Sequence, residues 1–119
     1  LATDLPVRPW KELCTCPYED LDSPSRVHVD AYGNVMVCQG ISIGNIWRTG
    51  LAEIVQTYRS SVHPICGPLL KGGPAALAQA VAASPEKGYV DECHFCYSVR
   101  RAKLKNYPDD LAPQQVYGL

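Results

Sequence analysis

Alternating apolar and polar residues predict a β-hairpin over residues 26–38. In "RVHVDAYGNVMVC" valines recur at every second position on both sides of a central "YGN", which is the pattern of two half-buried strands. Gly33 and Asn34 suit the turn because both residue types adopt positive φ at low cost. The stretch "QGISIGNIW" comes next, and we interpret it as a glycine-punctuated loop.

Helical patterns follow this loop. Apolar residues at 51, 54, 55 and 58 share one face of a helix that Thr49 can cap and that ends near residue 58 or 60. Pro64 and Pro74 stand where a first helical turn accepts proline, before "ICGPLLK" and "AALAQAVAA". The pair "GG" at 72–73 separates these two segments. The sequence therefore predicts several short helices after the hairpin.

The last helix of the pattern is the longest. Asp91 can cap a helix that runs through about Asn106 and ends before Pro108. A final turn at "PQQVYG" is expected to fold back within residues 107–119. Residues 1–25 carry four prolines and read as an extended leading segment. Together these elements predict an α+β fold.

Length and composition exclude several classes of protein. The chain has 119 residues and a formal net charge of −1, so we expect one domain over 26–106 that is no nucleic-acid binder and no membrane-surface protein. No apolar run approaches the roughly 18 residues of a membrane span, and we expect no signal peptide ahead of the domain. Because the chain begins with Leu1 and not with methionine, we expect it to be a fragment or a processed product.

The six cysteines are the main candidates for chemistry. They stand at 14, 16, 38, 66, 93 and 96, and they are too few for a disulfide scaffold, which needs roughly 8–10% cysteine. Two pairs, Cys14 with Cys16 and Cys93 with Cys96, are so close in sequence that each is more naturally a metal chelate than a disulfide crosslink. A chelate implies a reducing compartment, so we predict a cytoplasmic protein.

The spacing of the cysteines suggests a metal centre. On a helix, Cys93 and Cys96 project from one face about one turn apart, as two ligands of one centre do. Cys38 ends the second hairpin strand, and Cys14 or Cys16 can reach the same place from the leading segment. Four such thiolates suit zinc or a four-iron four-sulfur (4Fe-4S) cluster. Structural zinc sites usually use two C-x2-C pairs, so the spacing favours the cluster.

A resemblance now becomes specific. The hairpin "GNVMVC", the following "ISIGNIWRTGLAEI" and the later "DECHFC" resemble the SPASM/twitch auxiliary domain of radical S-adenosylmethionine (radical SAM) enzymes. That pattern has an upstream cysteine, G-x4-C, a "GN" loop, a helix and C-x2-C. The resemblance covers about residues 14–104, and the lack of further cysteines matches the shorter, single-cluster twitch form.

The resemblance implies a cofactor and partners. It places the ligands of one 4Fe-4S cluster at Cys16, Cys38, Cys93 and Cys96, with Cys14 as the alternative to Cys16. The chain lacks the C-x3-C-x2-C motif that binds the S-adenosylmethionine-cleaving cluster. S-adenosylmethionine and that second cluster are therefore expected in a catalytic barrel N-terminal to this chain, which by itself would be no enzyme. The implied role is electron relay or structural support, with a peptide or small-molecule substrate and a reductant as further partners. A structural zinc module that mediates protein contacts is the alternative.

Other residues receive simpler interpretations. Cys66 is read as a core or half-buried thiol, and His63 as a surface or capping residue. His94 points away from Cys93 on the helix, which disfavours ligation. The basic run "RRAKLK" after the cysteine pair reads as a solvated face, or else as a docking face for the barrel or an electron donor.

Overall fold

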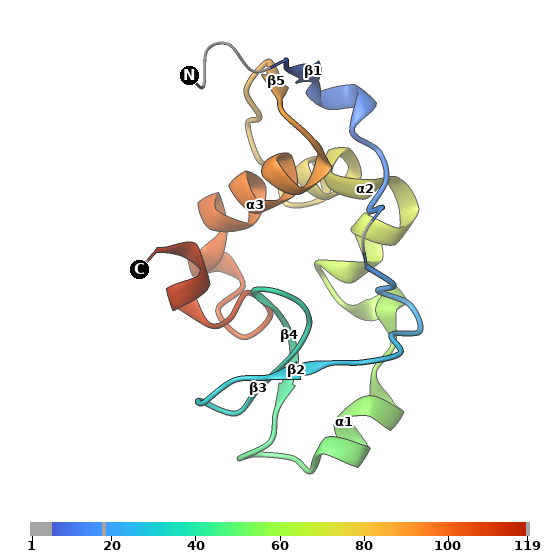
Figure 1. Ribbon diagram of the computed structural model, residues 1–119, viewed down its shortest axis with the longest axis vertical. Helices are drawn as coiled ribbons and strands as arrows, with labels where there is room; N and C mark the ends of the chain where they lie inside the picture. The colour runs from blue at the N-terminus through green and yellow to red at the C-terminus, as the bar shows by residue number, and fades with distance from the viewer. Residues whose placement is uncertain (1–5, 18, 119) are drawn as a thin grey trace.

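The computed structural model describes residues 6–17 and 19–118. In this part of the chain the fold is α+β, as predicted, with two small sheets and three α-helices. The elements in chain order are β1 (Arg8–Pro9), β2 (His28–Val29), β3 (Asn34–Cys38), β4 (Ile41–Asn45), α1 (Leu51–Thr57), α2 (Cys66–Ala80), β5 (Gly88–Tyr89) and α3 (Glu92–Ala102). The β1–β5 ribbon lies at one end of the long axis, α2 and α3 lie in the middle, and β2–β4 with α1 form the other end (Figure 1).

The predicted hairpin is confirmed and is extended by a third strand. β2, β3 and β4 form one antiparallel sheet in that order, and Gly33 has the positive φ, +84°, that its turn requires. The interpretation of "QGISIGNIW" as a loop was wrong, because most of it is β4. Its glycine at 44 hides the strand pattern, but Ile54 of α1 packs closely against that glycine, so that an added Cβ atom would lie 3.0 Å from the Ile54 side chain.

The predicted apolar face of α1 is only partly buried. Ile54 is 4% exposed, whereas Leu51 and Val55 are 43% and 50% exposed. The helix begins after Gly50, and no side chain caps it, so the capping role predicted for Thr49 was wrong. α1 therefore meets the sheet through a narrow contact around Ile54.

Two further helices, α2 and α3, form the middle of the molecule and pack against each other. α2 is kinked at Gly72 and Gly73, where the sequence predicted a break. Asp91 caps α3 as predicted, because its Oδ1 accepts the His94 N–H at 2.8 Å. α3 ends at Ala102, and residues 104–106 continue as a separate 3₁₀ turn. The shared core includes Leu13, Leu21, Val37, Ile41, Ile65, Leu69, Leu77, Phe95, Val99, Leu104, Leu111 and Tyr117.

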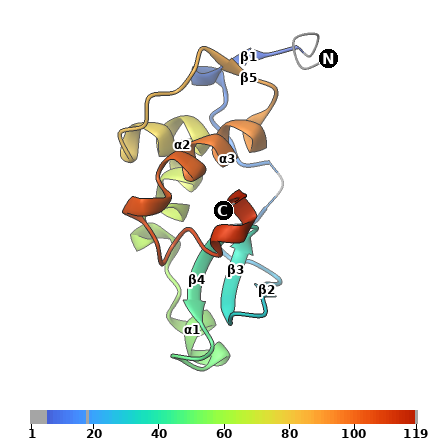
Figure 2. The ribbon, with the colours of Figure 1, turned by 90° about the vertical axis from the view of Figure 1, so that its left-hand side faces the viewer.

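The two ends of the chain are fastened to this core. β1 pairs antiparallel with β5, and the Trp10 ring packs edge-on against Phe95 at 6.0 Å between centroids. The leading segment then runs along one side of the molecule to the three-stranded sheet (Figure 2). Residues 10–12 of this segment form a 3₁₀ turn, and its residues 1–5 and 18 lie outside the described part. The C-terminal turn folds back as predicted, with a 3₁₀ turn over Gln114–Tyr117.

Helices in the described part of the chain are too short or too polar to cross a membrane.

Candidate metal centre

Four cysteines line one pocket between α3, the end of β3 and the leading segment. They are Cys16, Cys38, Cys93 and Cys96, the residues that the sequence suggested as ligands. Apolar side chains form much of the remaining wall, and Glu19, Glu92 and Arg100 are its charged residues; the apolar ones include Leu21, Ile41, Leu69 and Pro74. The pocket thus gathers thiols from three places in the sequence that lie far apart.

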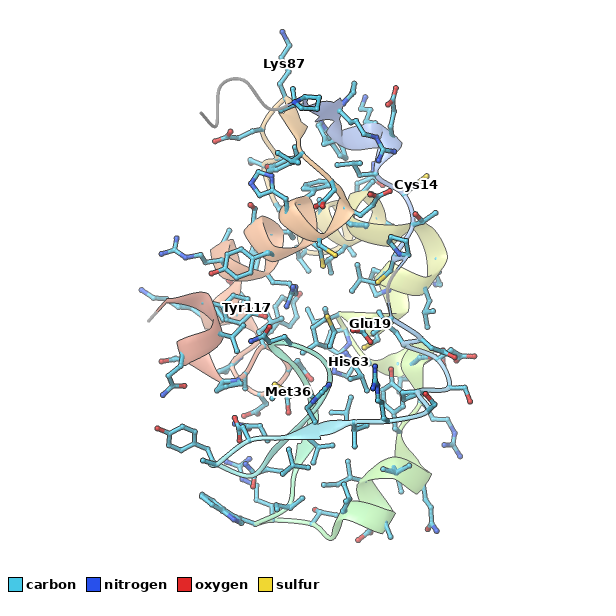
Figure 3. The ribbon with its side chains drawn as sticks, viewed as in Figure 1. Cys14, Glu19, Met36, His63, Lys87 and Tyr117 are labelled. Carbon is cyan, nitrogen blue, oxygen red and sulfur yellow. The ribbon has the colours of Figure 1, made fainter. Side chains whose placement is uncertain are left out.

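The leading segment presents Cys16, and not Cys14, to the pocket. Its backbone is held against α2, since the Ala75 N–H donates to the Leu13 carbonyl at 3.0 Å. Cys16 is half-buried and lines the pocket. Cys14 is exposed, and its side chain lies at the outer edge of the molecule (Figure 3).

Cys38 reaches the pocket from the last position of β3. It is half-buried, and burial raises the pKa of its thiol, with Glu19 adding to the rise and Arg100 opposing it. The turn that follows β3 is fixed at Gly40, whose carbonyl accepts the Tyr117 hydroxyl at 2.6 Å. The C-terminal turn therefore holds the loop that directly follows Cys38.

α3 supplies the other two thiols. Cys93 is exposed at the first turn of the helix and Cys96 is buried one turn later. Burial raises the pKa of both thiols. At Cys96 the Arg100 guanidinium opposes that rise by its charge and by a hydrogen bond. The i, i+3 spacing predicted from the sequence thus brings both residues to one wall of the pocket.

Arg100 is the residue that the sequence interpretation missed. It belongs to the basic run read as a solvated face, yet it is 6% exposed and lines the pocket. Arg101 and Lys105 of the same run are exposed, as expected. The signal was present in the spacing, since Arg100 stands four residues after Cys96 and so lies above it on the helix.

Cys66 and the histidines have other places. Cys66 is fully buried in the core, as predicted, and forms a hydrogen bond with the Tyr58 side chain. His63 is buried and caps α2: its Nδ1 accepts the N–H groups of Ile65 and Cys66 at 3.2 and 3.1 Å. His94 is exposed, and its Nδ1 accepts the Val90 N–H at 3.2 Å.

The pocket is not a ready-made site for one metal ion. Among the residues that the structure describes, no three or more histidine, cysteine, aspartate or glutamate side chains are gathered closely enough to hold one.

No protein-family model, curated protein or solved structure matched the chain. We therefore argue its function from the pocket and from the cysteine pattern.

Proposed function

We propose that this chain binds a 4Fe-4S cluster in the cysteine pocket and is the auxiliary domain of a radical SAM enzyme. The supporting observation is that Cys16, Cys38, Cys93 and Cys96 line one pocket. The two remaining cysteines, Cys14 and Cys66, are not part of the lining of this pocket. If the cysteines served only as small hydrophobic residues of the core, nothing would require four of them, from three distant parts of the sequence, to line one pocket.

The donor set of the pocket fits such a cluster. Thiolates are the usual protein ligands of iron–sulfur clusters, and a thiolate-ligated cluster is anionic. Arg100 places a buried positive charge at the same pocket. The apolar wall residues, Leu21, Ile41 and Leu69, are at most 2% exposed and limit access of water. Glu19 and Glu92 also line the pocket, but Glu19 is exposed and Glu92 is paired with Arg8. The buried charge that Arg100 supplies therefore suits an anionic group.

The chain's own residues would hold the cluster and control its surroundings. Cys16, Cys38, Cys93 and Cys96 would be the ligands, and Arg100 would balance their charge. When bound, the cluster supplies one-electron transfer. Four protein thiolates leave no iron free for substrate, so the role is electron relay or structural support. The partners would be an N-terminal radical SAM barrel, a peptide or small-molecule substrate, and a reductant.

Anaerobic reconstitution tests the proposal directly. The 119-residue chain would be incubated with iron, sulfide and a thiol reductant, desalted, and analysed for iron, acid-labile sulfide and zinc. We expect about four irons per chain and a brown protein whose reduced form gives an EPR signal. One zinc and no iron under these conditions would contradict the cluster and favour a structural zinc module.

Two variants on α3 show where the iron binds. Cys93→Ala and Cys96→Ala should each lose most of the iron. Ser98→Ala, on the same helix and outside the lining of the pocket, is the matched control and should keep it. Equal iron content in all three variants would place the metal elsewhere.

A further inference from the structure

Arg100 is a buried cation in the wall of the cysteine pocket. Its side chain is 6% exposed, and it leaves α3 one turn after Cys96. Arginine stays charged under all ordinary conditions, so this burial places a permanent positive charge inside the fold.

The protein groups that hold Arg100 are neutral. Nη1 donates to the Gln39 carbonyl and to the Tyr117 hydroxyl, each at 2.8 Å. The guanidinium also lies over the Tyr117 ring, with Cζ 5.5 Å from the ring centroid. These contacts fix the plane of the guanidinium, but they supply no negative charge.

Arg100 has no carboxylate partner in the part of the chain that the structure describes. The salt bridges found there join Arg8 to Glu92 and His63 to Asp110. In addition, Arg100 Nε is buried and has no hydrogen-bond partner among the described residues. A buried charge is normally paired, and a buried N–H without an acceptor calls for an explanation.

Cysteine thiols lie beside Arg100, and they become anionic when they bind a metal centre. Cys96, Cys38 and Cys93 interact with its charge, and all three line the pocket. Glu19 and Glu92 line the pocket too, but neither forms a salt bridge with Arg100 in the described part of the chain, and Glu92 is paired with Arg8. A group that binds these thiols as thiolates would bring the missing negative charge and would offer sulfur acceptors for the free N–H.

We propose that Arg100 is the counter-charge and hydrogen-bond donor of the thiolate-ligated group in this pocket, and that it sets how readily that group accepts an electron. The inference rests on the proposed function. Reduction adds one electron, delivered by a one-electron reductant, and no proton moves. Since the bound group gains one negative charge, a fixed cation nearby stabilises the reduced form more than the oxidised form.

A redox titration of matched arginine variants tests this role. The reconstituted chain, Arg100→Gln, Arg100→Lys and Arg101→Gln would be titrated with dithionite and followed by EPR. Arg101 is the control, because it is the next residue of the same helix, carries the same charge and is exposed. The variants would be compared at equal iron content, with far-UV circular dichroism to confirm the fold.

We expect Arg100→Gln to shift the equilibrium at least tenfold toward the oxidised form, a fall of about 59 mV in midpoint potential for one electron. Arg100→Lys keeps the charge, so its midpoint potential should fall less than that of Arg100→Gln. Arg101→Gln should change the midpoint potential several-fold less than Arg100→Gln does. Equal shifts for Arg100→Gln and Arg101→Gln would overturn the inference, because position in the pocket would then be irrelevant.

A second measurement uses the wild-type chain and does not depend on whether an Arg100 variant folds. Wild-type chain labelled with ¹⁵N-arginine would be reconstituted, reduced and examined by pulsed EPR. We expect a ¹⁵N coupling to the reduced cluster, unchanged in Arg101→Gln. Its absence in the wild type would refute the contact even if no Arg100 variant could be loaded.

These results separate the two proposals. A wild-type chain that takes up no iron refutes the proposed function, and the role of Arg100 falls with it. A wild-type chain that holds the cluster, with a potential insensitive to Arg100 and no ¹⁵N coupling, refutes only the inference about Arg100.

Discussion

Only Thr15 separates Cys14 from Cys16 in the sequence, but the two cysteine side chains have different surroundings. Cys16 lines the pocket and Cys14 is exposed at the edge of the molecule (Figure 3). The sequence favoured Cys16 as the first ligand and kept Cys14 as an alternative, and this choice stays a prediction.

The single substitutions should therefore be unequal. Cys14→Ser should keep the iron content of the wild type after anaerobic reconstitution, and Cys16→Ser should lose most of it. Iron analysis of both proteins, prepared in parallel, checks this prediction. Loss of iron in Cys14→Ser with full retention in Cys16→Ser would reverse the assignment of the first ligand.

Cys66 is expected to be a structural thiol. It is fully buried, and its hydrogen bond with the Tyr58 side chain accompanies one from the Tyr58 hydroxyl to the Leu21 carbonyl. Cys66→Ser should leave iron content unchanged and lower the free energy of unfolding by about 1–3 kcal/mol, because a more polar group is buried. Urea denaturation of the metal-free chain and iron analysis measure the two effects. A variant of unchanged stability that loses iron would make Cys66 a ligand.

At the scale of elements, the kink in α2 positions the leading segment. Gly73 has φ +61° and ψ −156°, a backbone conformation that residues other than glycine rarely adopt. A Cβ atom there would also overlap with the backbone of Cys14 and Thr15. The glycine therefore allows the chain that carries Cys16 to lie directly against α2.

Gly73→Ala should both destabilise the fold and weaken the pocket. Strain alone costs about 1–3 kcal/mol, and the overlap adds to it. Gly118→Ala is the matched control, because Gly118 also has a positive φ, +79°, but has no atom within 4 Å of the added Cβ. Urea denaturation should show a larger loss for Gly73→Ala, together with lower iron content. Equal losses in the two variants would mean that the contact with the leading segment is unimportant.

At the scale of the whole molecule, the C-terminal turn closes the structure. Tyr117 is fully buried, and its hydroxyl accepts from Arg100 and donates to the carbonyl of Gly40, next to the β3 end that carries Cys38. Its ring stacks on Tyr97 of α3 with centroids 5.5 Å apart. One side chain thus connects the last turn, α3 and the sheet.

Tyr117→Phe should loosen this connection without removing the ring. The Gly40 carbonyl would lose a donor and Arg100 Nη1 an acceptor, which should lower the free energy of unfolding by about 1–3 kcal/mol. Tyr32→Phe is the control, because the Tyr32 side chain is 55% exposed, and it should change stability little. Chemical denaturation of the metal-free proteins measures both. Equal effects would show that the buried hydroxyl does not stabilise the fold.

The local pattern of the sequence determined several elements of this protein. Alternating valines around "YGN" predicted the β2–β3 hairpin, and Asp91 marked the start of α3, because these signals act between residues close in sequence. The i, i+3 spacing likewise placed Cys93 and Cys96 on one wall. Hydrophobic periodicity overestimated the burial of α1, since a helix buries only the part of its apolar face that finds a partner.

Only the tertiary structure decided which distant segments meet. The pairing of β1 with β5 joins residues 8–9 to residues 88–89, and two-residue strands leave no readable pattern in a sequence. The convergence of Cys16 and Cys38 with α3 depends on the kink in α2 and on the turn after β3. The burial of Arg100 depends on Tyr117, which returns from the far end of the chain to cover it. Sequence spacing selected the thiols, but long-range packing brought them into one pocket. The same packing placed a buried cation beside them, because the burial of a residue depends on what packs on its helix face and not on the residues of that face alone.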